Sequence, residues 1–363
     1  TQSACARALA HCRYVRDTAQ HLQPDIHQKR QGHRPDLSKE LAGGWLISLD
    51  ISKAFDTVSR ATLHHALVDA GVPPTIISDV MRLVHSATYH VAPGTTYQVR
   101  STRGIHQGCT LAPTLWLFVM GYLHRKACDF LPPQFTKAIT YFADDTFLTH
   151  QVHSVPDLRR SLRHAREFMD LLSQHGLVIN SHKSKALLQL RGKLAPQALA
   201  RYTTKGTSSA GKAILLPPSS IFTSNGLVIP WVDSVSYLGI VLSFESPENL
   251  TMDSNLQKAK SRYMQLRKLL TGRSSLSRQH RIKLWMTCVV PISLYGLEVT
   301  GLTDKGASQL RAVLVRQLRA IARSPAHLTH ETTSALQARC RVPDPVKRLH
   351  ETAKKALARL TQA

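Results

Sequence analysis

The chain has 363 residues and is 43% hydrophobic, so it is long and apolar enough to bury the cores of two or three domains or subdomains and is not a disordered chain. Its 47 Lys and Arg residues outnumber its 23 Asp and Glu residues, which gives a net charge of +24. This excess predicts a polyanionic partner, most simply a nucleic acid, with an anionic membrane as the weaker alternative.

Apolar runs in the sequence fall short of the roughly 18–20 residues that a membrane-spanning helix needs. The closest candidates, Leu111–Leu123 and Leu284–Leu297, contain proline, and we interpret both as buried core. The 6 cysteines include no CxxC pair, which argues against a zinc finger or a disulfide framework and favours a reducing, intracellular compartment. Because the chain lacks an initiator Met and a signal-peptide pattern and starts inside a predicted helix, we expect a fragment of a longer protein.

The N-terminal region leads to an acidic residue at the end of a strand. A helix is predicted over 1–23, followed by a polar, basic loop over 28–39. The run Trp45–Leu49 is almost continuously apolar, which predicts a strand buried on both faces. Asp50 lies at its exit, where a carboxylate costs free energy unless it is solvated or binds a cation.

Two helices are predicted next. Ser59 is expected to cap the first of them, which Gly71 and Pro73 end, and a second short helix is expected over Ile76–His85.

A glycine-containing turn then precedes a buried helix. The strand-like segment Tyr97–Arg103 leads into Gly104-Ile-His-Gln-Gly108, whose two glycines allow close approach of the backbone to another group. The following helix, to about Phe130, is apolar almost all round and is predicted to be buried.

The segment Ile139–His150 is predicted to form a β-hairpin, because strand-forming residues flank a two-residue polar break made by Asp144 and Asp145. Two carboxylates at a hairpin tip repel each other, so the arrangement costs free energy unless a cation neutralises it. Taken alone, the pattern fits an ordinary Asp-rich turn as well as a metal site.

After this hairpin, an amphipathic helix is predicted from Pro156 to Gly176, followed by a short strand over 177–179. The segment Asn180-Ser-His-Lys-Ser-Lys185 comes next. Residues 192–226 are rich in Gly, Ser, Thr and Pro and are predicted to be a flexible connection. A second hairpin is predicted over Val235–Leu242.

From about residue 246 the pattern is helical and strongly basic, with 21 Lys and Arg against 7 Asp and Glu over residues 246–363. In the helix predicted near 306–323, three arginines share one face and four apolar residues share the opposite one. These are Arg316, Arg319 and Arg323, and Leu310, Leu314, Leu318 and Ile321. A solvated face accounts for any single arginine, but their concentration favours a phosphate-binding surface.

Five motifs, in this order and at this spacing, resemble the reverse transcriptase domain of non-LTR (LINE-type) retrotransposons. They are LDISKAF (49–55), GIHQGCTLAP (104–113), YFADDTFL (141–148), GLVINSHKSK (176–185) and SYLGIVLS (236–243). The resemblance implies an α+β fold of the right-hand polymerase type. It implies partial fingers at 1–44, a ferredoxin-like reverse transcriptase palm at 45–245, and a basic helical thumb at 246–363.

The resemblance implies phosphoryl transfer assisted by two Mg²⁺ ions about 3.5–4 Å apart, which activate the primer 3′-hydroxyl and stabilise the leaving pyrophosphate. Asp50 and Asp144 are the expected ligands, since Mg²⁺ prefers hard oxygen donors. Asp145 completes the triad, and the carbonyl of Ile51 is a further candidate ligand. Mn²⁺ is the expected substitute ion.

Four more roles follow from the resemblance. Phe55 is expected beneath the incoming sugar as a steric gate against a 2′-hydroxyl, and Gln107 and Gly108 are expected near the nascent base pair. Lys183 is expected to meet the leaving pyrophosphate, with Lys185 as a competing candidate. The plain alternatives are core packing for Phe55, a surface loop for Gln107 and a solvated side chain for Lys183. The turn expected to grip the primer end consists of Tyr237, Leu238 and Gly239.

The expected function is RNA-directed DNA synthesis (reverse transcriptase activity) for retrotransposition, with an RNA template, a DNA primer or target and dNTPs as partners, no membrane, and a nuclear location. A catalytically silent nucleic-acid-binding remnant and a group II intron maturase, which shares the Phe-Ala-Asp-Asp hairpin, are the alternatives. Because only 49 residues precede Asp50 and the family's basic fingers motifs lie far upstream of that position, we expect an incomplete nucleotide clamp. A zinc site at His327, His330 and Cys340 is disfavoured by its spacing.

Overall fold

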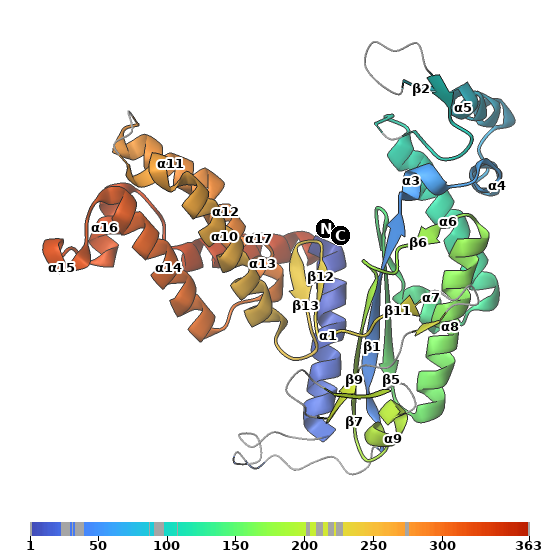
Figure 1. Ribbon diagram of the computed structural model, residues 1–363, viewed down its shortest axis with the longest axis horizontal. Coiled ribbons are helices and arrows are strands. Elements are labelled where there is room, and N and C mark those ends of the chain that lie inside the picture. The colour runs from blue at the N-terminus through green and yellow to red at the C-terminus, as the bar shows by residue number, and fades with distance from the viewer. Residues whose placement is uncertain are drawn as a thin grey trace. The chain divides into compact units, whose positions relative to one another are not determined.

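The computed structural model describes residues 2–22, 30, 32, 40–86, 88–90, 98–106, 108–200, 204–207, 213–216, 221–222, 228–272 and 276–361. The chain divides into two compact units. We call Tyr14–Asp233 the sheet unit, and Thr1–Arg13 with Ser234–Ala363 the helical unit. The predicted N-terminal helix is α1 (Gln2–Leu22), which contributes residues to both (Figure 1). The loop predicted over 28–39 lies outside the described residues, apart from Arg30 and Gly32.

The sheet unit is built around one central strand, β1 (Ala42–Ser52), which the apolar run in the sequence predicts. Along one edge it pairs antiparallel with β5 (Asp145–Val152), and along the other with β7 (Lys185–Arg191) and, at its end, with β6 (Val178–Ile179). Strand β4 (Thr140–Phe142) pairs with β5 and completes the five-stranded sheet. Strand β1 has partners on both edges, and its apolar side chains are buried, as predicted, namely Trp45, Leu46, Ile47, Leu49 and Ile51.

Two long helices cover the sheet and supply a large part of the core. Figure 1 shows α6 (Ala112–Phe130) and α8 (Val155–Gln174) along one face of the sheet. Ser154 caps α8 by accepting a hydrogen bond from the Asp157 backbone N–H at 3.2 Å. The core that these helices share with β1 and β5 includes Leu123, Phe135, Leu148, Leu162, Phe168 and Met169.

The segment between β1 and α6 is mainly helical, as predicted. It contains α3 (Ala54–Thr57), α4 (Arg60–Asp69) and α5 (Pro74–Ser86). The predicted cap of α4 is confirmed, because Ser59 Oγ accepts a hydrogen bond from the Thr62 backbone N–H at 2.9 Å. Two short strands complete this segment, β2 (Thr88–His90) and β3 (Gln98–Arg100), and the short helix α7 (Pro133–Ala138) follows α6.

The prediction of a flexible connection over 192–226 is wrong in part. Helix α9 (Ala195–Ala200) buries Ala195 and Ala198 against the sheet-unit core, so small apolar residues order a segment that its composition marks as a linker. Short antiparallel pairs follow, formed by β8 (Thr204–Thr207) with β9 (Ala213–Leu216) and by β10 (Ile221–Phe222) with β11 (Val228–Ile229).

The helical unit contains the second predicted hairpin and the basic C-terminal third. The hairpin is formed by β12 (Val235–Tyr237) and β13 (Ile240–Leu242). The helices are α10 (Pro247–Thr271), α11 (Arg278–Cys288), α12 (Val290–Leu294), α13 (Leu297–Thr300), α14 (Asp304–Ala322), α15 (Ala326–Thr329), α16 (Thr333–Cys340) and α17 (Pro345–Thr361). The predicted apolar stripe of α14 is confirmed, since its members are buried in one core, namely Leu310, Leu314, Leu318 and Ile321.

The apolar stretch Arg278–Thr300 has the length and mean hydropathy of a membrane-spanning helix, which exceeds what we expected of any run in this sequence. In the structure it is divided into α11, α12 and α13, with Pro291 near the start of α12. Its larger apolar side chains lie in the helical-unit core, as the interpretation of buried core requires, including Ile282, Trp285, Val289, Val290 and Leu297.

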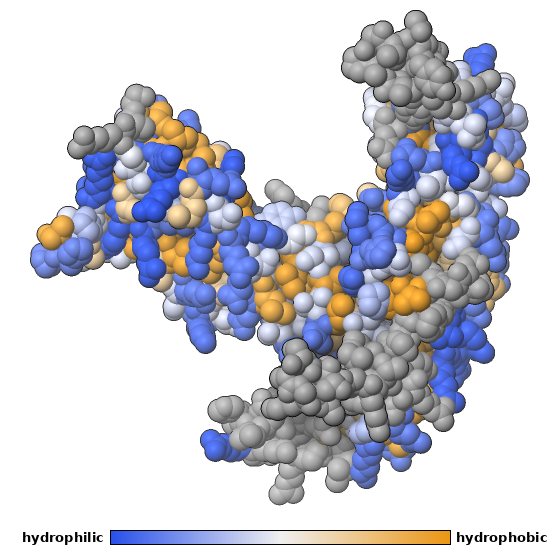
Figure 2. Space-filling model, in the orientation of Figure 1, coloured by the Kyte–Doolittle hydropathy of each residue, from blue (hydrophilic) through white to orange (hydrophobic). Residues whose placement is uncertain are grey.

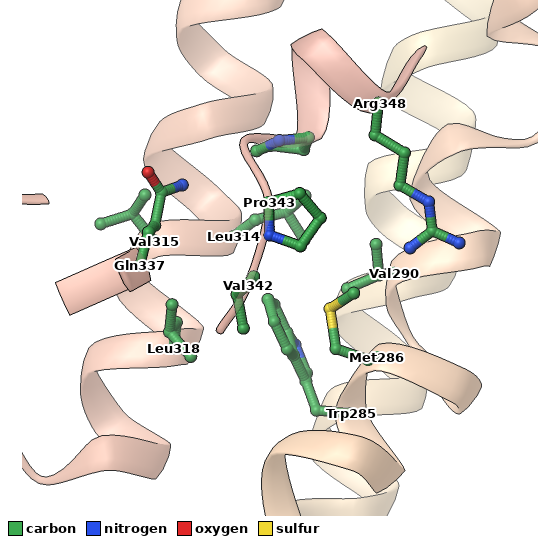
Figure 3. A pocket seen from close by; sticks show the side chains of 11 residues that line it. Trp285, Met286, Val290, Leu314, Val315, Leu318, Gln337, Val342, Pro343 and Arg348 are labelled. Atoms are coloured by element: carbon green, nitrogen blue, oxygen red, sulfur yellow. The ribbon is translucent and has the colours of Figure 1, made fainter. Parts of the chain in front are cut away.

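A small apolar pocket lies inside this core between α11, α14 and α16 (Figure 3). The Trp285 ring points into it beside Val342 and Leu318, and the pocket volume of about 10 Å³ is near that of a single water position. The pocket is therefore too small to be a substrate site.

Candidate active site

The two strand-end acids predicted from the sequence meet in the structure. Asp50 of β1 and Asp145 of β5 are directly opposed residues of the antiparallel pair, so their side chains belong to the same face of the sheet. The hairpin differs in one detail from the prediction. Phe142 pairs with Asp145, which leaves Ala143 and Asp144 as the two turn residues and makes Asp145 the first residue of β5. Asp144 is exposed and Asp145 is half-buried.

The electrostatics of this cluster favour a bound cation. Burial, and after it the negative charges of Asp144 and Asp50, raise the pKa of the Asp145 carboxyl, and the positive charge of Lys183 opposes the rise. Among the residues that the structure describes, no three His, Cys, Asp or Glu side chains converge tightly enough to enclose a metal ion. Hard oxygen donors that repel one another suit an ion such as Mg²⁺, which completes its shell with water and substrate phosphates.

Asp50 is held at both of its backbone polar groups by the loop after β6. Its N–H donates to Ser184 Oγ at 3.1 Å, and its carbonyl accepts from the Asn180 N–H at 2.8 Å. The Asn180 side chain in turn accepts from the backbone N–H groups of His182 and Lys183, at 3.1 and 3.3 Å. This explains the Asn-x-x-Lys spacing physically, because the asparagine folds the loop that carries Lys183 around Asp50.

Two residues that support the site were not predicted as site residues. Asn180 could have been recognised, because it is the first residue of the Asn-x-x-Lys motif. Fully buried Ser184 could not, because it bonds to Asp50, which lies far away in the sequence.

The ammonium group predicted to act in the site lies beside the carboxylates. Lys183 Nζ is 3.8 Å from Asp50 Oδ1, and its side chain is 70% exposed, so the pair is loose. The competing candidate, Lys185, belongs to β7 and lies opposite Ser48 in the register. The structure therefore favours Lys183 over Lys185 as the partner of Asp50. Ile51 lies next to Asp50 in β1 and pairs with Ile179, and its carbonyl stays a predicted ligand.

Phe55 lies in α3, immediately after β1. Its carbonyl accepts the Ile105 N–H at 2.6 Å, and its ring packs on Trp116 with 5.2 Å between ring centroids. Gly104 makes this approach of the two segments possible, because a Cβ there would lie 2.6 Å from the Asp56 carbonyl oxygen. The glycine-containing turn is thus brought to Phe55, as the order of motifs requires.

Gly108 is exposed and has a φ of +88°, a backbone conformation that favours glycine, with open space around it. The close approach expected of both glycines is therefore made within the chain by Gly104 alone. Gln107 lies outside the described residues.

The Tyr-Leu-Gly turn lies in the helical unit. Leu238 and Gly239 are the two turn residues, with φ values of +47° and +87°, as a tight hairpin requires. The Tyr295 hydroxyl donates to the Leu238 carbonyl at 3.0 Å, and Asn255 donates to the Tyr295 carbonyl at 2.6 Å. Tyr237 is buried.

The helical unit also carries a basic groove of about 510 Å³ along α14. The three arginines predicted to share a helix face line it together with His327. The guanidinium of Arg319 is anchored by the carbonyls of Ser324 and Glu331 at 3.2 and 2.9 Å. On the face of this unit shown in Figure 2, hydrophilic side chains alternate with apolar ones. In the described part of the chain, His327, His330 and Cys340 do not form a metal-binding group.

Comparison with known proteins gives one family. Residues 1–242 match the family model for reverse transcriptase (RNA-dependent DNA polymerase). The chain is 26% identical to a retrovirus-related Pol polyprotein from type-1 retrotransposable element R2 of Bradysia coprophila, over 80% of this chain and 30% of that protein. It is 24% identical to the RNA-directed DNA polymerase from mobile element jockey of Drosophila melanogaster, over 89% and 32% of the two chains. A solved structure of apo telomerase from Candida Tropicalis matches with a TM-score of 0.43 and 13% identity, over 91% of this chain and 47% of that chain.

The chain thus has a five-stranded sheet with paired carboxylates near the end of its central strand. It also matches one family model over two thirds of its length. The chain belongs to the reverse transcriptase (RNA-dependent DNA polymerase) family, and its relatives are the non-LTR retrotransposon proteins that its five motifs indicate. The predicted mixture of helices with an antiparallel sheet, as an α+β fold requires, is confirmed, and the family generally uses divalent metals. The chain spans about a third of the length of the curated relatives named above.

Proposed function

We propose that this chain catalyses RNA-templated DNA synthesis by extending a primer 3′-end, and that this activity serves retrotransposition. The observation that carries the proposal is the direct opposition of Asp50 and Asp145, with Asp144 in the adjoining turn. Carboxylates gathered in this way from distant parts of the chain are the donor set that metal-assisted phosphoryl transfer needs.

In this proposal, Asp50, Asp144 and Asp145 hold two Mg²⁺ ions, with the Ile51 carbonyl as a further ligand and Mn²⁺ as a substitute. When bound, the ions supply positive charge to the attacking and leaving oxygens of the phosphoryl group. Asn180 and Ser184 keep Asp50 in register. Lys183, held loosely by Asp50, is free to turn to the leaving pyrophosphate and neutralise its charge or protonate it.

The nucleotide is proposed to lie over Phe55, whose ring rejects a 2′-hydroxyl sterically, and beside Gln107 and Gly108. The positive φ and exposure of Gly108 leave its backbone open to a ligand, which supports this assignment.

The rest of the chain is proposed to bind the nucleic acids, with fingers at 1–44, palm at 45–245 and thumb at 246–363. The arginine-lined groove of α14 supports phosphate binding by the thumb. The turn Tyr237–Gly239, fixed by Tyr295, is proposed to grip the primer end. A template RNA, a DNA primer or target and dNTPs are the proposed partners, and a nuclear location follows from such work.

One alternative function has an observation in its favour. The basic groove would bind nucleic acid whether or not the carboxylates act, so a catalytically silent binding protein is the second candidate. A maturase-like activity would use the same carboxylates and differs in its RNA substrate.

The metal dependence of primer extension tests the proposal. We expect this chain to extend a DNA primer annealed to RNA in Mg²⁺ or Mn²⁺, to stop on chelation, and to resume when the metal is returned. A chain that binds the hybrid but extends it under none of these conditions supports the silent alternative.

A further inference from the structure

A buried tryptophan lies between the two parts of the candidate active site. Trp116 of α6 is only 2% exposed, and its indole N–H donates to the carbonyl of Ala143 at 2.6 Å. Ala143 is the first turn residue of the hairpin that presents Asp144 and Asp145. The motifs of the sequence assign no role to Trp116.

The turn that this bond reaches is strained. Ala143 has a φ of +53°, a left-handed conformation that a residue with a Cβ rarely adopts. The free-energy cost of that conformation and the net gain from one well-formed, partly buried hydrogen bond are of the same order. The indole N–H is therefore strong enough to decide whether the turn keeps the geometry that presents Asp144 and sets Asp145 opposite Asp50.

The same indole also supports the predicted steric gate. The Phe55 ring packs on the Trp116 ring at 5.2 Å between centroids, with an interplanar angle of 39°. The Phe55 backbone is fixed independently by the Ile105 N–H. One rigid side chain, anchored in a long core helix, thus contacts both the carboxylate turn and the residue proposed to face the sugar.

We propose that Trp116 is a positioning residue of the active site: its N–H sets the carboxylate turn and its ring sets Phe55. The inference rests on the proposed function. Trp116 would then support both metal binding and sugar selectivity without itself contacting the metal or the nucleotide.

A second tryptophan provides the matched control. Trp45 is fully buried in the same unit, and its indole N–H also donates a hydrogen bond, to Ser161 Oγ at 2.9 Å. That bond joins β1 to α8 and does not reach the hairpin turn. Trp45→Phe and Trp116→Phe thus remove the same chemical group from equally buried rings.

Mn²⁺ binding to the chain without nucleic acid, followed by electron paramagnetic resonance, is the first readout. We expect Trp116→Phe to weaken binding about five- to tenfold, as loss of one hydrogen bond predicts, and Trp45→Phe to leave it within about twofold. In primer extension, Trp116→Phe should also change the ratio of deoxyribonucleotide to ribonucleotide incorporation. If both variants weaken Mn²⁺ binding equally, or Trp116→Phe binds as the native chain does, the inference is wrong.

A double variant tests the strained turn itself. Glycine adopts the left-handed conformation readily, so Ala143→Gly should make the turn less dependent on the indole. The Mn²⁺ affinity lost through Trp116→Phe should then be smaller in the Ala143→Gly background than in the native one. Equal losses in the two backgrounds would contradict the proposed coupling.

The native chain offers a measurement that needs no tryptophan variant. With its 4 tryptophans labelled at the indole nitrogen, Mg²⁺ should shift the N–H resonance of Trp116 and leave that of Trp45 in place. A native chain whose Mn²⁺ binding equals that of Asp144→Ala would overturn the proposed function together with this inference. Binding that is lost in Asp144→Ala, with an unmoved Trp116 resonance, would overturn the inference alone.

Discussion

The ammonium group of Lys183 lies 3.8 Å from the Asp50 carboxylate, at the edge of the carboxylate cluster. In the absence of metal this lysine forms an ion pair with Asp50, and its high exposure keeps the pair weak. Lys183 can therefore be released from Asp50 without a large free-energy cost. The pairing suggests a lysine that alternates between the carboxylates and the phosphates of a substrate.

Replacing Lys183 with glutamine should lower the rate of extension about 10²–10³-fold, as loss of a charge-stabilising or proton-donating group does. Mn²⁺ binding should stay equal or become tighter, because the competing cation is gone. Single-turnover extension and Mn²⁺ titration measure the two effects. Lys185→Gln, on β7, is the control and should extend primers at the native rate. Loss of Mn²⁺ binding together with rate would assign Lys183 to folding of the loop instead.

The raised pKa of Asp145 predicts a gain of stability on removing its charge. A carboxyl whose pKa is higher in the folded state than in the unfolded state stabilises the fold below the folded pKa, and this contribution is lost as pH rises through it. Without metal at pH 7, Asp145→Asn should therefore be more stable than the native chain, by about 1 kcal/mol or less, while losing extension. Thermal unfolding in a chelator measures the change.

Asp157 provides the control, because its pKa is shifted in the opposite direction. Burial raises its pKa, but hydrogen bonds from His150 and the His153 backbone outweigh burial and leave the pKa lowered. Its contribution is present above the unfolded pKa and is lost as pH falls through the folded one. Asp157→Asn should thus lower the unfolding temperature. A loss of stability in both variants would show that carboxylate repulsion does not govern Asp145.

Gly239→Ala should destabilise the turn Tyr237–Gly239, which is proposed to grip the primer end. A Cβ at this position would lie 2.5 Å from the Tyr295 ring, and the φ of +87° disfavours any other residue. The expected cost is about 1–3 kcal/mol, measured by thermal unfolding, with weaker binding of the primer–template hybrid. Gly71→Ala, which has a φ of +71° but open space, should cost less. Equal costs would mean that contact with Tyr295 contributes nothing.

Phe55→Val should raise ribonucleotide incorporation relative to deoxyribonucleotide incorporation, because the smaller side chain leaves room for a 2′-hydroxyl. Competitive primer extension measures the ratio. Phe135→Leu, a core change elsewhere in the sheet unit, should leave it unchanged. Unaltered sugar selectivity in Phe55→Val would remove the gate assignment and leave Phe55 as a packing residue.

Arg316→Gln should weaken hybrid binding and reduce the slope of log affinity against log salt by about 1, because each arginine that neutralises a phosphate releases counterions. Filter binding over a range of salt concentrations measures both. Arg82→Gln is the control, because Arg82 pairs with Asp79 at 2.9 Å, and it should leave the slope unchanged. An unchanged slope in Arg316→Gln would show that the α14 groove does not contact phosphates.

The sequence predicts the parts of this site that depend on local pattern. The apolar run before Asp50 marks β1 as a strand buried on both faces, and the residues around Asp144 mark the hairpin of β4 and β5. The Ser59 cap follows from its place before an apolar stripe. These features are set by neighbours close in the chain or by strand periodicity, so they are visible without a structure.

The contacts that hold the site together are of another kind. The bonds from Trp116 to Ala143 and from Asp50 to Ser184 join residues far apart in sequence, and each ends on a backbone atom or a small hydroxyl. Neither hydrogen bond produces a pattern of residue types that can be recognised in the sequence. The turn was also predicted one residue too late, because Ala143 gives no sign that it adopts a left-handed conformation.

The carboxylate cluster is proposed to perform RNA-templated DNA synthesis, and Asp144, its exposed member, is the residue to substitute. The measurement is extension of a DNA primer on an RNA template by the native chain and by Asp144→Ala, with hybrid affinity measured in parallel. We predict Mg²⁺-dependent extension by the native chain and none by Asp144→Ala, at hybrid affinities within about twofold, since one exposed carboxylate contributes little to phosphate binding. Extension that persists in Asp144→Ala would contradict the metal assignment and the account built on it.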